Sequence, residues 1–231
     1  MATFVLIHGA GDVGRSWCLV EERLRARGHD VVAPDLPCED EDAGLAETAD
    51  AVVEAIGGRE NLVVVGHSLG GFTAPLVADR LPALALVYLA AMVPAPGERA
   101  TQWWENTGYA AAVAAQAARD GGLTGHEDPY VSFYNGVPRG LAEEAIARSR
   151  GQSSRFMDDV WSLPAQPSLP TRFLLCRDDR FFPADFLRRV ARERLGITAG
   201  EMPGCHCAML SHPRELAEAL ERSLRTGTVT G

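Results

Sequence analysis

Short apolar runs and longer amphipathic stretches succeed one another along this 231-residue chain. Runs rich in β-branched residues are typical of buried strands, and longer amphipathic stretches are typical of helices that cover a sheet. The apolar runs predict strands over residues 4–7, 29–33, 62–65, 83–91, 171–176 and 197–201. The amphipathic stretches predict helices over residues 16–27, 45–56, 72–80, 109–119, 141–150, 184–195 and 213–225. This alternation indicates an α/β protein with a doubly wound, mostly parallel sheet and helices on both faces.

The alternation breaks after Pro94. About 75 residues separate the fourth and fifth predicted strands, far more than a simple connection needs. This segment contains two of the predicted helices and three of the four tryptophans, Trp103, Trp104 and Trp161. We therefore expect a single domain over residues 1–231, with residues 94–170 inserted after the fourth strand as a helical cap.

The strongest chemical signal lies where the third predicted strand ends. The strand runs into Gly66-x-Ser68-x-Gly70, and a predicted helix follows. This is the spacing of a nucleophile elbow, in which a strained turn raises the serine hydroxyl above the edge of the sheet. The glycines let strand and helix pass closely, and the amide of Leu69 at the start of the helix can stabilise an oxyanion. A tight turn with an incidental serine is the alternative, which the flanking strand and helix disfavour.

The loop after the first strand fits a second kind of site. Glycines at Gly9, Gly11 and Gly14 form a G-x-G-x-x-G motif between a strand and a helix. Asp35 lies about 20 residues farther on, where dinucleotide-binding folds place the acid that binds the ribose. An NAD(P)-dependent oxidoreductase is therefore the main alternative function.

The basic residues weigh against that alternative. All 22 of them are arginine, so the chain lacks the lysine that the tyrosine–lysine pair of short-chain dehydrogenases requires. The same loop has another use in hydrolases, where it places a backbone amide opposite the nucleophile. Here that amide belongs to Ala10, which we expect to be the second oxyanion-hole donor beside Leu69.

A serine nucleophile needs a histidine base and an acid that orients it. On hydrolase sheets the acid and then the histidine follow the serine along the chain. Asp178 and Asp179 both follow the fifth predicted strand, and either could serve. We favour Asp179, because Asp178 comes directly after Arg177 and is expected to pair with it at the surface. His206, in the loop after the sixth strand, is the predicted base.

The other histidines and cysteines near these loops are not expected to bind a metal. Cys205 and Cys207 flank His206, but three consecutive side chains cannot readily converge on one ion, and no second ligand pair has suitable spacing. His8 and His67 flank the backbone donors and are expected to hold the loops by hydrogen bonds. We therefore expect neither a metal nor a cofactor.

Four stretches now support a family resemblance: residues 4–10, 66–71, 179–183 and 204–210. They resemble the α/β-hydrolase superfamily, and most closely its small methylesterase and hydroxynitrile lyase branch. The resemblance spans nearly the whole chain. It implies Ser68 as nucleophile, Asp179 as acid, His206 as base and the amides of Ala10 and Leu69 as oxyanion hole.

The resemblance also separates the two reactions of that branch. Its lyase members carry a threonine after the first histidine and a lysine after the catalytic one. This chain has Gly9 and Cys207 at those positions, so the resemblance implies the esterase reaction.

Composition narrows the partners and the compartment. The formal charge of -9 argues against nucleic acid and anionic membranes, and no apolar run approaches the length of a membrane span. Five irregularly spaced cysteines are typical of reduced thiols, and no basic leader precedes the first strand. A cytoplasmic protein is therefore expected, and the sequence does not decide between a monomer and a homodimer.

The cap should supply an apolar substrate pocket. We expect it to be lined by Trp104, Phe133, Phe156, Trp161 and Met209, although packing explains each of them equally well when taken alone. The function expected is a cofactor-free serine hydrolase that cleaves an ester, lactone or thioester of a small, uncharged, apolar or aromatic molecule through an acyl-enzyme. A ligand receptor that keeps the triad but has little turnover is the alternative outside catalysis.

Overall fold

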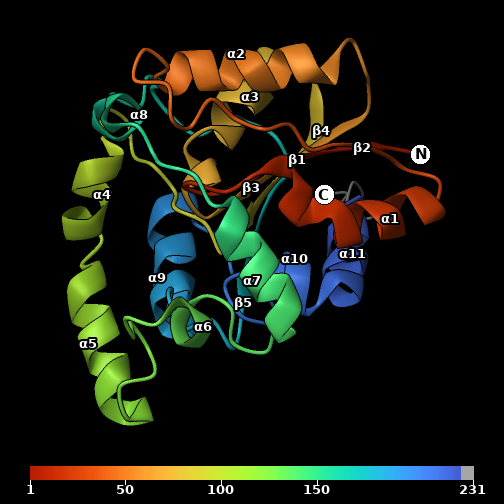
Figure 1. The fold of residues 1–231 in the computed structure, drawn as a ribbon. Coiled ribbons are helices and arrows are strands. Elements are labelled where there is room, and N and C mark those ends of the chain that lie inside the picture. Colours follow the sequence, from red (N-terminus) through yellow and green to blue (C-terminus); the bar gives the residue numbers. More distant parts are fainter. Residues whose placement is uncertain (225–231) are drawn as a thin grey trace.

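The computed structural model describes residues 1–224 and contains a six-stranded sheet with helices on both faces (Figure 1). The strand order is β2-β1-β3-β4-β5-β6, and every neighbouring pair is parallel. The strands are β1 (Thr3–Ile7), β2 (Asp30–Val32), β3 (Leu62–His67), β4 (Ala83–Leu89), β5 (Thr171–Cys176) and β6 (Gly200–Met202). The predicted fold class is thus confirmed, and the sixth strand begins three residues later than expected.

The strand order changes direction between β1 and β3. From β1 the chain moves outward to β2 and then returns past β1 to form β3. In such sheets the loops at the carboxyl ends of the two central strands diverge to opposite faces and leave a crevice. The loop that begins at His8 and the loop that begins at Ser68 meet at this point.

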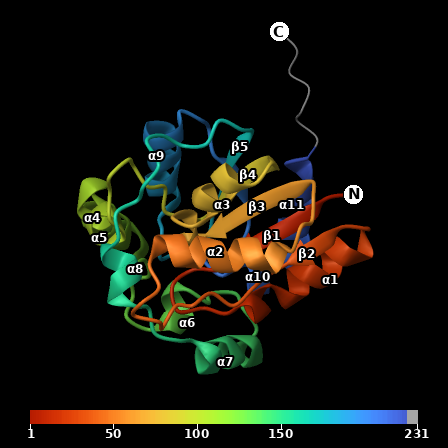
Figure 2. The ribbon, with the colours of Figure 1, turned by 90° about the horizontal axis from the view of Figure 1, so that it is seen from above.

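Two pairs of helices cover the sheet. Helices α2 (Leu45–Ile56) and α3 (Ala74–Arg80) pack together on one face, while α1 (Cys18–Ala26) and α11 (Pro213–Arg222) pack together on the other (Figure 1). Figure 2 looks down on α2, which lies over the strands. Helices α9 (Ala184–Leu195) and α10 (Ala208–Ser211) complete this part of the molecule. The predicted end of the last helix at residue 225 lies outside the described residues.

The central strands form the core. All six residues of β3 and all five of β1 are buried, as expected for strands covered by helices on both faces. Burying each valine, leucine or isoleucine side chain there contributes roughly 1.5–3 kcal/mol to folding. Within residues 1–224, no helix combines the length and apolar character that a membrane crossing would require.

Residues 94–170 form five short helices between β4 and β5. They are α4 (Ala100–Asn106), α5 (Tyr109–Asp120), α6 (Pro129–Ser132), α7 (Arg139–Arg148) and α8 (Ser154–Asp158). Both views show α4, α5 and α8 together on the side of the molecule opposite the N-terminus, and α6 and α7 nearer its middle (Figures 1 and 2). We refer to this segment as the cap, because its residues line a cavity together with Ser68, which follows the carboxyl end of β3.

Polar anchors hold the cap to the sheet domain at several points, and Glu98 and Arg150 provide two of them. Glu98 is 5% exposed and accepts two hydrogen bonds from Arg194 of α9, at 3.0 and 2.9 Å. Arg150, just after α7, donates its backbone N–H to the Gly11 carbonyl at 2.6 Å and its guanidinium to the Asp12 carbonyl at 2.8 Å. The second anchor ties the cap directly to the loop after β1.

Candidate active site

Ser68 comes directly after β3 and has a positive φ of 51°. This left-handed conformation is strained for a residue with a side chain and turns the hydroxyl away from the strand. A Cβ on Gly66 would lie 2.7 Å from the Ala74 Cβ, and a Cβ on Gly70 would lie 2.6 Å from the His8 carbonyl oxygen. Only glycine therefore fits at either position, as the elbow spacing predicted.

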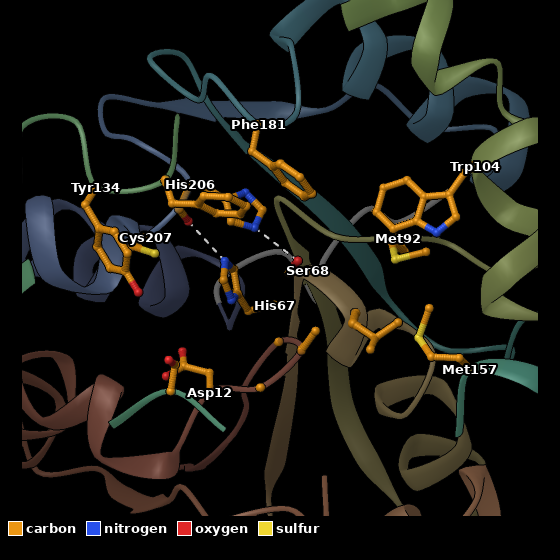
Figure 3. Close-up of a pocket in the computed structure, with 16 residues that line it drawn as sticks. Asp12, His67, Ser68, Met92, Trp104, Tyr134, Met157, Phe181, His206 and Cys207 are labelled. Atoms are coloured by element: carbon orange, nitrogen blue, oxygen red, sulfur yellow. Dashed lines mark hydrogen bonds between the residues drawn. The ribbon is translucent and has the colours of Figure 1, made fainter. Parts of the chain in front are cut away.

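The structure brings Ser68, His206 and Asp179 into one hydrogen-bonded series (Figure 3 shows its serine and histidine). His206 Nε2 lies 3.0 Å from Ser68 Oγ, and His206 Nδ1 lies 2.8 Å from Asp179 Oδ2. A carboxylate only accepts hydrogen bonds, so Nδ1 carries the proton and Nε2 is free to accept from the serine hydroxyl. This is the tautomer that a general base requires.

Asp179 is held rigidly behind the histidine. Its other carboxylate oxygen accepts hydrogen bonds from the backbone N–H groups of Phe181 and Phe182, both at 2.8 Å. Asp179 is 5% exposed and His206 is 2% exposed. Phe181 also packs its ring against His206, with the ring centroids 4.9 Å apart. Both members of the Asp179–His206 pair are thus largely shielded from water.

His8 and His67 fix the loops around the serine, in line with the sequence expectation. His67 Nε2 donates to the His206 carbonyl oxygen at 3.0 Å, which ties the elbow to the loop after β6. His8 Nδ1 donates to the Gly9 carbonyl at 2.9 Å, and its Nε2 accepts from the Leu36 N–H at 3.1 Å. Burial lowers the pKa of both imidazoles, that of His67 well below its usual value, so both are neutral.

The glycine motif after β1 is accounted for by close packing within the chain. A Cβ on Gly9 would lie 2.9 Å from the Ser68 Cβ. One on Gly11 would lie 2.4 Å from the Arg150 carbonyl oxygen of the cap, and one on Gly14 would lie 2.1 Å from the Ala33 carbonyl oxygen just after β2. Asp35 accepts a hydrogen bond from the Gly14 N–H at 2.7 Å. No feature of the loop is left that only a bound dinucleotide would explain.

The expected surface pair of Asp178 with Arg177 is wrong. Asp178 Oδ2 accepts from the Gly204 N–H at 2.9 Å, and the Asp178 N–H donates to the Gly204 carbonyl at 3.0 Å. Asp178 therefore ties the loop after β5 to the loop that carries His206. The prediction rested on Arg177 being next to Asp178 in the sequence. Within residues 1–224, no ion pair joins these two side chains.

A cavity of about 250 Å³ opens above Ser68, between the sheet edge and the cap. Ala10 and Leu69 lie in its wall beside the serine, and Trp104 and Phe133 line it from the cap. Further lining residues were not predicted as ligand contacts; they are Gly9, Gly11, Asp12, His67, Met92, Tyr134, Ser149, Met157, Phe181 and Cys207.

Three predicted contacts lie elsewhere. Trp161 is fully buried and donates its indole N–H to the Phe72 carbonyl at 3.2 Å. Met209 and Phe156 are 0% and 5% exposed and belong to the hydrophobic core. All three pack the interior and do not line the cavity, so the sequence expectation for them is wrong. Met157 is the lining residue next to Phe156, and one position in a short helix decides which of the two faces the cavity.

The thiols near the histidine are protonated. Burial raises the pKa of Cys205 to about 11 and that of Cys207 well above its usual value. In the part of the chain that the structure describes, no three histidine, cysteine, aspartate or glutamate side chains form a group that could hold a metal ion.

Comparison with known proteins agrees with this geometry. The sequence matches the model of the "Alpha/beta hydrolase family" over residues 4–219. Salicylic acid-binding protein 2 of Nicotiana tabacum is 30% identical, with 94% of this chain and 95% of that protein aligned. The probable esterase PIR7A of Oryza sativa subsp. indica is also 30% identical, with 95% of each chain aligned.

A solved structure shows the same fold. The crystal structure of polyneuridine aldehyde esterase superposes with a TM-score of 0.77 over 96% of this chain and 98% of that one, at 21% sequence identity.

Proposed function

Because the chain belongs to the alpha/beta hydrolase family, we propose that it is a serine esterase that acts through an acyl-enzyme. The observation that carries the proposal is the hydrogen-bonded series from Ser68 through His206 to Asp179, at 3.0 and 2.8 Å, on the floor of a cavity. The esterases among its relatives support ester cleavage as the reaction class. The substrate is a small-molecule ester, and the reaction needs no cofactor.

In the first half-reaction, Ser68 Oγ attacks the ester carbonyl carbon while His206 Nε2 takes the hydroxyl proton. A C–O bond to the serine forms, and the carbonyl electron pair moves onto the oxygen. When the tetrahedral intermediate collapses, the bond to the alcohol oxygen breaks, and His206 returns the proton to that oxygen. Asp179 orients the imidazole and stabilises its positive charge throughout.

In the second half-reaction, water takes the place of the alcohol. His206 removes a proton from water as its oxygen attacks the acyl carbon, and then delivers that proton to Ser68 Oγ. The products are the carboxylic acid and the free serine. An ester, a lactone or a thioester fits this scheme, since each has an acyl carbon and a leaving oxygen or sulfur.

The amides of Ala10 and Leu69 are the oxyanion-hole donors in this scheme. Gly9 passes so close to Ser68 that a Cβ on it would lie 2.9 Å from the serine Cβ, so the loop backbone lies against the side chain of the nucleophile. Leu69 begins the turn that leads into α3, where unpaired N–H groups and the helix dipole favour negative charge. Loss of one such donor typically lowers kcat by about 10²–10³-fold.

The acyl group is small and apolar or aromatic. Trp104, Met92 and Met157 form one side of the cavity, which at about 250 Å³ is small for a ligand site. Each methylene buried there contributes about 0.8 kcal/mol to binding.

Five free cysteines also support the cytoplasm as the compartment.

Covalent labelling tests this proposal. A fluorophosphonate should modify Ser68, and Ser68→Ala should abolish both labelling and ester hydrolysis. Ser168→Ala is the matched control, because Ser168 is exposed and does not line the cavity. Full esterase activity in Ser68→Ala would exclude the mechanism. An acyl burst without further turnover would instead favour the slow receptor, and micromolar NAD(P)H binding would favour the oxidoreductase.

A further inference from the structure

The cavity has two unlike sides. Trp104, Met92 and Met157 lie on one side of Ser68, whereas Asp12, Tyr134 and Cys207 lie on the other, with His206 (Figure 3). The first side is apolar. The second carries a carboxylate, a phenol and a thiol, and the proposed reaction gives none of them a role.

The carboxylate of Asp12 has no cationic partner. Its Oδ1 accepts from the Val13 N–H at 2.8 Å and from the Ser16 hydroxyl, which fixes the side chain. Arg150 lies near but donates to the Asp12 backbone carbonyl, and no ion pair among residues 1–224 includes Asp12. No arginine lines the cavity, so within the cavity the carboxylate faces no cationic side chain.

His67 adds a second acceptor to the same region. Its Nε2 donates to the His206 carbonyl, so Nδ1 carries a lone pair. Nδ1 is buried and has no hydrogen-bond partner, although buried polar atoms are nearly always paired. In Figure 3 this nitrogen points away from His206, towards the side where Asp12 lies. The lone pair and the carboxylate together give this side of the cavity a negative potential.

Tyr134 completes the subsite. Burial raises the pKa of its phenol, which neighbours Asp12 and Cys207 and therefore stays neutral. The face of a tyrosine ring attracts cations, and its presence beside a carboxylate is typical of ammonium-binding sites. A carboxylate, a free lone pair and a neutral aromatic ring are complementary to a positively charged hydrogen-bond donor.

We propose that Asp12 and Tyr134, beside the lone pair of His67, bind a protonated amine carried by the leaving alcohol of the ester, so that the preferred substrates are esters of amino alcohols. The inference rests on the proposed function and specifies its substrate class. His206 protonates the leaving oxygen, so the leaving group lies on the His206 side of Ser68, which is the side of Asp12. The acyl group then occupies the apolar side.

Two esters of the same shape test the proposal. The 2-(dimethylamino)ethyl and 3-methylbutyl esters of phenylacetic acid differ in one position, where a protonated nitrogen replaces a CH group. The wild-type protein should cleave the amine ester with a kcat/KM at least about tenfold higher near neutral pH, since a hydrogen bond to a charged group typically has this effect or more. This advantage should shrink at high ionic strength, because salt screens charges that water can reach.

Asp12→Asn identifies the residue responsible. Asparagine keeps an oxygen for the Val13 N–H and the Ser16 hydroxyl, and removes only the charge. The ratio of kcat/KM between the two esters should fall about tenfold, whatever happens to the absolute rates. Asp79→Asn is the control, because Asp79 is exposed at the end of α3, does not line the cavity and carries the same charge; the ratio should not change.

The outcomes separate this inference from the proposed function. Equal rates for the two esters in the wild-type protein would overturn the amine site and leave the esterase intact. An unchanged ratio in Asp12→Asn would remove the role of Asp12. If the Asp12→Asn protein does not fold, the ratio of kcat/KM between the two esters in the wild-type protein still tests the amine site. Failure to cleave any ester, together with an unlabelled Ser68, would exclude both the esterase and the amine site.

Discussion

The edge of the sheet and the cap face each other across one cavity, but different forces hold them. At the sheet edge, Ser68, Asp179 and His206 each lie within a few residues of the carboxyl end of a strand and are at most 9% exposed. In the cap, α5 has no buried residue at all, and three of the five helices have seven residues or fewer. Isolated helices of this length do not form in water, so the cap depends on contacts with the sheet domain.

This difference separates the two parts of an enzyme's task. Catalytic geometry must be accurate to a fraction of an ångström, and strands buried on both faces provide that rigidity. Substrate choice can be carried by a less stable segment, because short elements with few buried contacts open with small free energies. We therefore expect substitutions at the sheet edge to affect chemistry, and substitutions at the cap anchors to affect stability and access.

The largest effect should come from the acid. Asp179→Asn keeps the shape of the side chain but removes the charge behind His206 and favours the wrong tautomer, so kcat should fall about 10⁴-fold with the fold intact. Asp178→Asn is the matched control, since an amide oxygen can still accept from the Gly204 N–H. Steady-state kinetics and circular dichroism on both variants test this prediction. A larger loss of kcat in Asp178→Asn than in Asp179→Asn would identify Asp178 as the acid instead.

The second-largest effect should come from the cap anchor formed by Glu98 and Arg194. Arg194→Met would leave the Glu98 carboxylate buried without its partner, which typically costs about 3–5 kcal/mol. The thermal midpoint should fall by many degrees, whereas Arg192→Met, an exposed arginine on the same helix, should change it little. Adding Glu98→Gln to Arg194→Met should recover part of the loss. An Arg194→Met protein as stable as the wild type would show that the Glu98–Arg194 pair does not hold the cap.

The smallest effects come from a pair of glycines, one in each region. Gly70→Ala would bring a Cβ to 2.6 Å from a backbone oxygen and should destabilise the fold by about 1–3 kcal/mol. Gly140 in α7 has no atom within 4 Å of such a Cβ, so Gly140→Ala should stabilise by about 0.4–1 kcal/mol. Urea unfolding would measure both. Equal tolerance at the two positions would contradict the contrast between a tightly packed edge and a loosely packed cap.

The same contrast explains what the sequence could predict. Strands of continuous apolar residues and the spacing Gly66-x-Ser68-x-Gly70 are local patterns, so the sheet, the elbow and the residues of the series could be read from single stretches. The helices of residues 109–119 and 141–150 were also found within two residues of their observed limits, because each is ten residues or more.

The rest depends on contacts that no local pattern encodes. Helices α4, α6 and α8 form only where the sheet domain supports them, and they were not predicted. Trp161 and Trp104 are both cap tryptophans, but one donates to a core carbonyl and the other lines the cavity. Asp178 was expected to pair with Arg177 at the surface, and Asp12 had no predicted role. Asp178 meets Gly204, and the backbone of Asp12 meets Arg150, only in the folded chain.

The link between Arg150 and the loop after β1 has a consequence for protein engineering. Caps of hydrolases are attractive parts to exchange when a new specificity is sought. Here, however, Arg150 of the cap donates hydrogen bonds to the backbone carbonyls of Gly11 and Asp12, one and two residues past the proposed oxyanion donor Ala10. A graft that omits the arginine would release the loop that carries this proposed donor, so we expect that a change of cap would alter the rate as well as the specificity.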